Sequence, residues 1–166
     1  MRAVIVTVSA LLAALDQSPA PLVQFRFTEA EVNSWVSGQL KAKRHMGIQK
    51  STFKFFGNNY VSTYSTVDFD QLQRWQSDVI PSAAKLFLNG RRDLWIDFRF
   101  RSESGQISLH IEKAYIDTTS MPPAVANGLL QMIAAAAGEP DPTQLFPMPV
   151  RLAKVWTEGH ELCGGN

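Results

Sequence analysis

The side chains with the most chemical potential in this chain are its three histidines, His45, His110 and His160. None stands at metal-ligand spacing from another histidine or from the single cysteine. The sharpest pairing places Asp97 opposite His110 on a predicted hairpin, where the carboxylate would orient the imidazole as in a catalytic triad. Ser108 is a weak nucleophile candidate beside them. Because a surface cross-strand charge pair explains these residues better, we expect no enzyme activity.

The other polar candidates have structural explanations. Cys163 is flanked by glycine near the end of the chain and lacks the basic neighbourhood that a reactive thiol needs. Asp68 and Asp70 resemble a metal pair, but capping of a helix accounts for them better. A local basic stripe, which an acidic partner or head group could use, has nearby acidic residues that neutralise much of it. The stripe consists of Arg91, Arg92, Arg99 and Arg101. We therefore expect no metal and no cofactor.

Composition describes a compact, rather apolar globular domain. The chain has 166 residues, which is the size of one domain. Lys and Arg total 16 against 15 for Asp and Glu, and this balance argues against a nucleic-acid binder. The 45% hydrophobic content excludes a disordered tail. A single cysteine excludes a disulfide framework and a cysteine-rich zinc site.

Residues 1–20 are predicted to be a signal peptide and lead-in. Arg2 precedes an apolar run at 3–15, which is too short to cross a membrane as a helix, and Asp16 begins a polar stretch. The competing interpretation is an amino-terminal β-strand of the mature fold, since valines alternate along this run. We prefer the signal. It predicts a periplasmic or secreted protein whose single α+β domain spans residues 21–166.

Two longer helices are predicted. Thr28 and Glu31 form a capping box, so the first helix should span 28–42. Ser120 and the proline pair at 122–123 should start the second, and Gly138 should end it. Its apolar stripe is predicted to contain Val125, Leu129, Met132 and Ile133, widened by Leu130 and by residues 134–137. A short helix should follow Asp68 or Asp70.

Alternating apolar residues predict two antiparallel hairpins, at 48–69 and at 94–111. The second is expected to pair Phe100 with Ile107, Phe98 with Leu109 and Ile96 with Ile111. On its other face, Asp97 should lie near His110 and Trp95 near Glu112. A further strand is expected at 83–90 and a closing strand at 150–156, followed by a loose end. The fold class is therefore α+β, with helices packed on an antiparallel sheet.

The order of three motifs resembles small bacterial envelope proteins with tubular lipid-binding (TULIP-like) folds. These motifs are the capped helix opening at 27–33 (FTEAEVN), the passage from 114–117 (AYID) into the helix at 121–130 (MPPAVANGLL), and the closing strand at 149–156. The resemblance spans about residues 25–160. It implies a curved antiparallel sheet packed around a long helix in the carboxyl-terminal half, a groove that takes lipid, and no catalytic residues. The interval at 70–90 is shorter than in that group, and the loop at 139–149 is rich in proline.

The leading hypothesis is a non-enzymatic exported protein that binds a lipid or other apolar ligand between the sheet and the long helix. The expected lining residues are Phe53, Phe55, Phe98, Phe100, Leu129 and Ile133. The alternative is a protein-interaction or scaffold module of the cell envelope with a filled core. Its partner, or a membrane surface, would contact Trp95, Arg99 and Arg101.

Overall fold

The computed structural model describes residues 24–42, 47–75, 85, 88–136, 139–148 and 152–165. The predicted signal peptide and lead-in at 1–20 lie outside the described residues. The strands are β1 (Gln24–Thr28), β2 (Ile48–Phe56), β3 (Tyr60–Asp68), β4 (Arg91–Glu103), β5 (Gln106–Ile116), β6 (Thr119–Met121), β7 (Phe146–Pro147), β8 (Lys154–Glu158) and β9 (Glu161–Gly165). The helices are α2 (Glu29–Ala42), α3 (Phe69–Trp75) and α4 (Pro123–Ala136).

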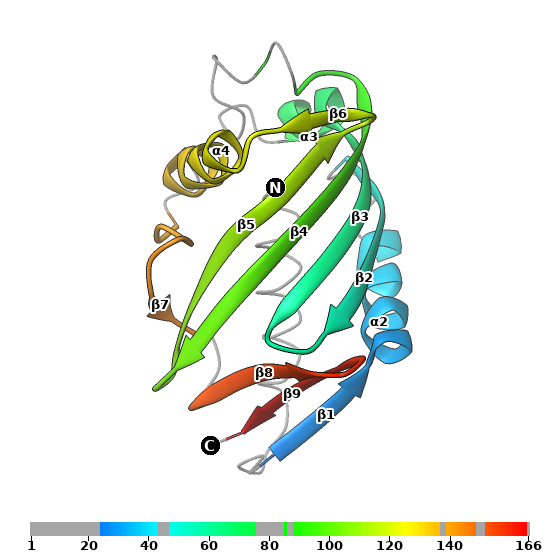
Figure 1. Ribbon diagram of the computed structural model, residues 1–166. Helices are drawn as coiled ribbons and strands as arrows, with labels where there is room; N and C mark the ends of the chain where they lie inside the picture. The colour runs from blue at the N-terminus through cyan, green and yellow to red at the C-terminus, as the bar shows by residue number, and fades with distance from the viewer. Residues whose placement is uncertain are drawn as a thin grey trace.

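Antiparallel pairing joins these strands into two sheets. The large sheet has the order β2-β3-β4-β5-β6, and β7 pairs with the other end of β5. The small sheet has the order β1-β9-β8. Figure 1 shows the large sheet as a curved layer, with α2 beside β2 and α4 beside β5 at its opposite margins. The α+β class and the antiparallel sheet are therefore confirmed.

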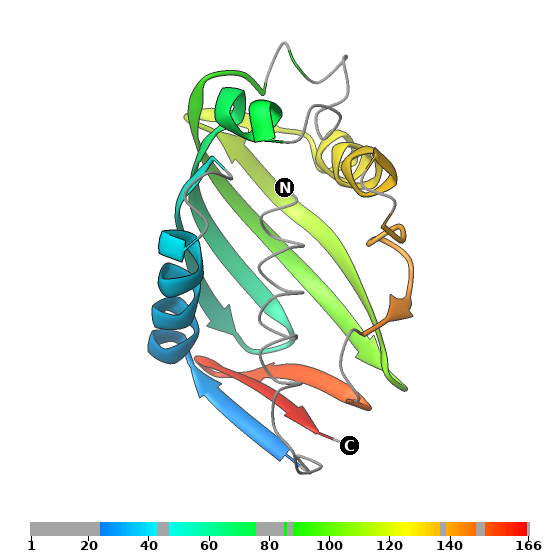
Figure 2. The same ribbon diagram turned by 180° about the vertical axis from the view of Figure 1, so that it is seen from behind.

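The expected long helix surrounded by the sheet is not found. Helix α4 has 14 residues, the same number as α2. At 1.5 Å per residue it extends about 21 Å, whereas the 13 residues of β4 extend about 43 Å. Figure 2 shows α4 next to the β5 margin of the sheet rather than along its middle. The helix therefore covers part of one side of the sheet.

The capped start of α2 is confirmed. Glu31 Oε2 accepts a hydrogen bond from the Thr28 backbone N–H at 2.8 Å, and Thr28 Oγ1 accepts one from the Glu31 N–H at 3.3 Å. These reciprocal bonds satisfy donors that the first helical turn leaves unpaired. Asp68 caps α3 in a related way, because its Oδ1 accepts from the Gln71 N–H at 2.8 Å.

The predicted register of the β4–β5 hairpin was wrong: next to the turn, each β4 residue lies opposite a β5 residue two positions later than predicted. Ser104 and Gly105 have φ values of 48° and 77°, so they form a two-residue hairpin turn that pairs Glu103 with Gln106. Phe100 therefore lies opposite Leu109 and Phe98 opposite Ile111. A bulge between Asp97 and Phe98 then shifts the register again and places Ile96 opposite Ala114.

This register also separates Asp97 from His110, the candidate pair that was expected to lie across the hairpin. Asp97 lies opposite Lys113, and His110 lies opposite Arg99. The placement of Asp97 opposite His110 was therefore wrong, as was Trp95 near Glu112, since Trp95 pairs with Tyr115. No triad-like arrangement is formed by these residues.

The expected loose end is instead strand β9, which pairs with β1 and β8. Strand β9 is short and contains two adjacent glycines, so apolar–polar alternation gives almost no signal for a strand here. Strand β1 was also missed, because its partner lies at the other end of the chain. Within 83–90, the described residues Lys85 and 88–90 form no strand.

Candidate functional site

Four of the predicted lining residues lie on the same face of the large sheet, the inner face, against which the helices pack. Phe53 and Phe55 come from β2, and Phe98 and Phe100 from β4. All four are buried, with exposed fractions of 3–6%. The ladder runs from Phe55 across Val61 of β3 to Phe98, so these two rings belong to one cross-strand row.

Helix α4 turns only part of its predicted apolar stripe, Leu130 and Ala134, toward this face. The buried residues are Ala126, Leu130 and Ala134, which repeat at intervals of four. Val125 and Met132, which were expected in the core stripe, are 50% and 43% exposed. The predicted stripe was therefore wrong at these two positions.

Of the two predicted lining residues on α4, the structure describes the side-chain burial of only one. Leu129 is partly buried and packs against the core, whereas the side chain of Ile133 lies outside the described residues. The assignment of all six residues to a ligand site stays a prediction.

One hydrogen-bonded side chain explains the orientation of α4. Asn127 Nδ2 donates to the Ile111 carbonyl at 2.8 Å, and Asn127 Oδ1 accepts from the Ile111 N–H at 2.9 Å. These bonds attach the helix to the outer edge of β5 and turn Ala126 and Leu130 toward the sheet. The helix carries no charged residue, so its hydrophobic pattern alone could not select a buried side.

A narrow apolar hollow lies at the β6 end of the inner face. Its volume is about 20 Å³, which is room for about one water molecule. Its lining consists of apolar and aromatic residues from α3, β4, β5 and β6 and from the segment before β4: Phe69, Leu88, Leu94, Ile96, Ile111, Ala114, Tyr115, Ile116 and Met121. Sequence reasoning missed this hollow because the shifted β4–β5 register and α3 together create it.

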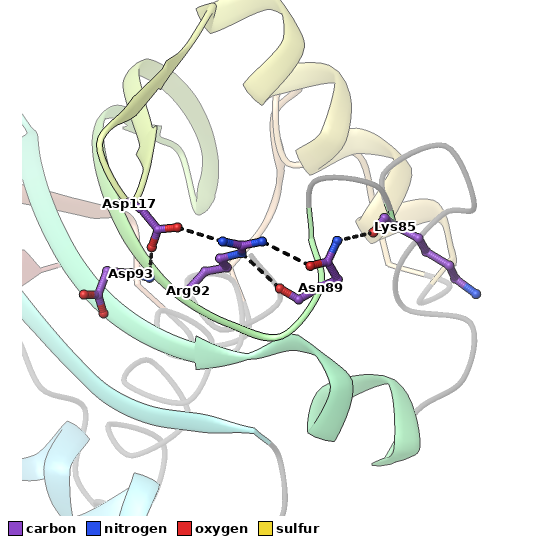
Figure 3. Close-up of polar contacts among 5 residues, drawn as sticks. All are labelled: Lys85, Asn89, Arg92, Asp93 and Asp117. Atoms are coloured by element: carbon purple, nitrogen blue, oxygen red, sulfur yellow. Dashed lines mark hydrogen bonds and ion pairs between the residues drawn. The ribbon is translucent and has the colours of Figure 1, made fainter.

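Polar contacts hold one wall of the hollow in place (Figure 3). Arg92 Nη1 donates to Asp117 Oδ2 at 3.1 Å, and its Nε and Nη2 donate to the backbone and side-chain oxygens of Asn89 at 3.1 Å each. Asp117 Oδ1 also accepts from the Asp93 N–H at 3.0 Å, and Asn89 donates to the Lys85 carbonyl at 3.0 Å. This network ties the segment around Leu88 to the β5–β6 turn.

Hydroxyl groups limit the apolar part of the inner face on the β2 side. Ser51 Oγ and Ser65 Oγ are 2.8 Å apart, and both residues are buried. Buried Thr63 donates to the Ile96 carbonyl at 3.2 Å. Because buried hydroxyls need such partners, this region is a poor surface for an alkyl chain. Around Ser51, Ser65 and Thr63 the inner face is therefore less apolar than along β4 and β5.

The opposite, outer face of the sheet carries an aromatic row. Register places Tyr64, Trp95 and Tyr115 side by side on three successive strands. Trp95 is 51% and Tyr115 is 38% exposed, which makes them prominent among the described apolar and aromatic residues. Trp95 Nε1 donates to Asp97 Oδ1 at 2.9 Å, so the indole ring has a fixed orientation.

Three of the four arginines of the predicted basic stripe are paired with carboxylates. Arg99 Nε contacts Glu112 Oε1 at 2.9 Å, and Arg101 Nη2 contacts Glu103 Oε2 at 2.9 Å. Arg92 is engaged by Asp117 as described above. Since these partners neutralise much of the positive charge, the aromatic row is the more distinctive feature of the outer face.

Tyr60 lies next to this face, and burial affects the protonation of its phenol. Desolvation by burial, followed by hydrogen bonding to Asp97, raises the pKa of the Tyr60 phenol to about 12. The Arg99 guanidinium lies 5.3 Å from the Tyr60 ring centroid and opposes this shift only in part. The phenol is therefore a neutral donor at physiological pH.

The described residues contain no group of three or more His, Cys, Asp or Glu side chains placed to hold a metal ion. Cys163 is a free cysteine and is fully buried, and burial raises the pKa of its thiol. It therefore lacks the exposure and thiolate character of a reactive cysteine. None of the described helices has the length and apolar character required to span a bilayer.

Comparison with known proteins gives little further information. No known protein family matches the sequence, and no curated protein sequence matches it. Among solved structures, a crystal structure of lipopolysaccharide binding protein is similar at a TM-score of 0.28 and 12% sequence identity. The similarity covers 86% of this chain and 40% of that protein's chain. This chain thus spans less than half of that protein, and the score is too low to indicate a shared fold.

Proposed function

We propose that this protein binds an apolar ligand of the acyl-chain class between the inner face of the large sheet and α4, without catalysing a reaction on it. The observation that carries the proposal is the apolar hollow at the β6 end of this face. Ile96 and Ile111 line the hollow, and their neighbours Phe98 and Leu109 continue the apolar surface along β4 and β5. A ligand that enters the hollow would therefore meet apolar side chains along its whole length.

The energetic gain would come from removing alkyl groups from water, at about 0.8 kcal/mol for each buried CH₂ group. The hollow is small, so binding requires the inner face to open. Met121 lines the hollow and is only partly buried, and an unbranched thioether side chain can adopt new rotamers at low cost. Leu129 of α4 is also only partly buried. We propose that movement of these side chains widens the site.

The proposal includes an envelope location. It rests on the predicted signal peptide at 1–20, which implies a periplasmic or secreted protein. An apolar-ligand carrier has a clear use between membranes, because alkyl chains cannot diffuse freely through water.

A fluorescent fatty acid titrated into the purified protein tests the proposal. The variant Ala114→Leu adds bulk inside the hollow, and Ala135→Leu makes the same change on the exposed side of α4. Affinity should fall about tenfold or more in the first variant and stay within about twofold of the wild type in the second.

Circular dichroism and the melting temperature establish that both variants are folded. If Ala114→Leu fails to fold, the smaller change Ala114→Val replaces it. Equal affinity in a folded Ala114 variant, or the absence of saturable binding by the wild type, would contradict the proposal.

The exposed aromatic row favours a second candidate, an interaction module with a filled core. Tyr64, Trp95 and Tyr115 present flat rings to solvent, and tryptophan and tyrosine are enriched at protein interfaces. A photo-crosslinking amino acid at position 95, compared with one at exposed Ser34 on α2, tests this candidate in the native host. A discrete crosslinked product from position 95 alone would support it, and equal or absent crosslinking at both positions would exclude it.

A further inference from the structure

The outermost long strands of the large sheet, β2 and β5, carry backbone groups on their outer edges that need partners beyond the long strands. On β5, every region of the outer edge is covered. The partners, in chain order along β5, are β7 at Gln106 and Ile107, the Pro142 carbonyl at Leu109, Asn127 at Ile111, and β6 at 114–116. The distance from the Leu109 nitrogen to the Pro142 oxygen is 2.6 Å.

Strand β2 is covered in the same manner at two positions. Asn33 Nδ2 donates to the Phe53 carbonyl at 2.9 Å, and Asn33 Oδ1 accepts from the Phe53 N–H at 2.7 Å. Glu29 Oε2 accepts from the Phe55 N–H at 2.8 Å. Side chains of α2 thus take the place of a neighbouring strand at alternate residues.

Ser51 is the next residue in this alternation. Backbone groups of residues i and i+2 point to the same side of a strand, so the N–H and C=O of Ser51 point outward like those of Phe53. Regular pairing with Ser65 of β3 maintains this direction. Its hydroxyl is engaged with Ser65 Oγ at 2.8 Å on the inner face. In the described part of the chain, no group hydrogen-bonds to the outward backbone groups of Ser51.

A groove of about 570 Å³ borders this uncovered edge, within the usual range of ligand clefts. It lies between the second half of α2 and the start of β2. Its polar lining includes Asn33, Ser37, Lys41, Gln49, Lys50 and Ser51. The described lining contains two lysines and no carboxylate.

The two lysines are not equivalent. Lys50 lies 5.8 Å from the centroid of the Tyr64 ring. Hydrogen bonds from Thr66 and Tyr64 lower the pKa of Asp93, and the charge of Lys50 adds a smaller contribution. Part of its charge is therefore compensated by neighbours on the outer face. Lys41 is exposed in the last turn of α2 and provides the less compensated charge.

We propose that an extended, acidic segment of a partner protein adds to β2 at Ser51 as a further strand and lies in this groove. An extended chain supplies both the acceptor and the donor that the edge needs, whereas a simple anion supplies only acceptors. The lysines favour acidic side chains on the added strand and oppose pairing with the same edge of a second copy. This partner site is separate from the proposed acyl-chain site on the inner face.

Titration of the ¹⁵N-labelled protein with an acetylated and amidated (Thr-Glu)₃ peptide tests the proposal by NMR. The Ser51 amide should shift at saturation, and its hydrogen exchange should slow about tenfold or more. The matched (Thr-Lys)₃ peptide should bind at least about tenfold more weakly. Failure of the acidic peptide to bind, or equal binding of the two peptides, would overturn the proposal.

Two substitutions at the same position isolate the backbone donor. Ser51→Pro removes the outward N–H, which proline at a sheet edge can lack without breaking the ladder, and Ser51→Ala removes only the hydroxyl. The acidic peptide should bind the proline variant about tenfold more weakly than the alanine variant. If the proline variant does not fold, Lys41→Glu serves as the second test and should reverse the preference between the two peptides.

Equal affinity of the proline and alanine variants, or an unchanged peptide preference in Lys41→Glu, would show that no strand is added here. Inorganic phosphate is the control for simple anion binding. A phosphate-induced shift of Ser51 that equals the peptide-induced shift would also overturn the proposal.

Discussion

At the scale of single residues, two asparagines on different helices perform the same task. Asn33 of α2 and Asn127 of α4 each bind both backbone groups of one residue on an outer strand. An asparagine side chain offers one acceptor and two donors, so it matches a peptide group in a way that aspartate cannot. These contacts determine where each helix sits on the sheet.

Replacement of either asparagine by alanine should lower the free energy of unfolding by about 1–3 kcal/mol, because it leaves two backbone groups of Phe53 or Ile111 without partners. Ser34→Ala, an exposed change on α2, should stay within about 0.5 kcal/mol of the wild type. Urea unfolding followed by circular dichroism measures both. A loss no larger than that of Ser34→Ala would contradict this role.

Tyr60 provides a residue-scale test by pH. Burial raises the pKa of its phenol to about 12, above the ordinary value of 10.0, so the unfolded chain loses this proton first. The contribution of Tyr60 to stability is therefore complete below pH 10 and is lost as the pH rises from 10 to about 12. Tyr60→Phe removes this contribution.

Chemical denaturation at intervals between pH 9 and pH 12 compares the two proteins. The free energy of unfolding of the wild type should fall more steeply than that of Tyr60→Phe above pH 10. Parallel curves over this interval would show that the phenol titrates alike in the folded and unfolded chains.

At the scale of secondary-structure elements, the sequence predicted the elements that local signals specify and missed those that depend on other signals. The capping box at Thr28, the hairpin turns and the apolar alternation of β4 each lie within a few residues, and the corresponding elements were predicted correctly. Strand β9 was missed although its partner β8 is local, because its five residues carry no apolar alternation. Strand β1 was missed because it is short and pairs with β9, more than 100 residues away. Pairing over such a distance leaves no pattern in either segment alone.

The candidate site was predictable only in part for the same reason. The sheet residues Phe53 and Phe98 were placed on the inner face by alternation. Hydrophobic periodicity reports neither the bulge between Asp97 and Phe98 nor the contacts of Asn127 that orient α4. The hollow at the β6 end depends on both features, and therefore it could not be predicted.

The rotation of α4 is testable with substitutions of similar size. Leu130→Ala should lower the free energy of unfolding by about 2–5 kcal/mol, because Leu130 is 2% exposed. Met132→Ala should cost less than about 1 kcal/mol, since Met132 is 43% exposed. Denaturant unfolding of the two variants measures the difference. Equal losses would mean that α4 has a different orientation on the sheet.

At the scale of the whole molecule, the two faces of the large sheet have different characters. The inner face holds the core, the hollow and the buried rings, whereas the outer face exposes an aromatic row among paired charges. Helix α2 packs mainly beside β2, and α4 mainly beside β5, at opposite margins of the long strands of this sheet. This division is the reason for proposing an apolar ligand on the inner face and partner proteins on the outer face and the β2 edge.

Mass spectrometry of an organic extract tests the central claim most directly, with the protein purified from its own host. We expect a lipid at about one molecule per chain in the wild type and in Ala135→Leu, and a loss of about tenfold or more in Ala114→Leu. An extract without lipid, repeated after incubation of the protein with added lipid and still without it, would contradict apolar-ligand binding on the inner face.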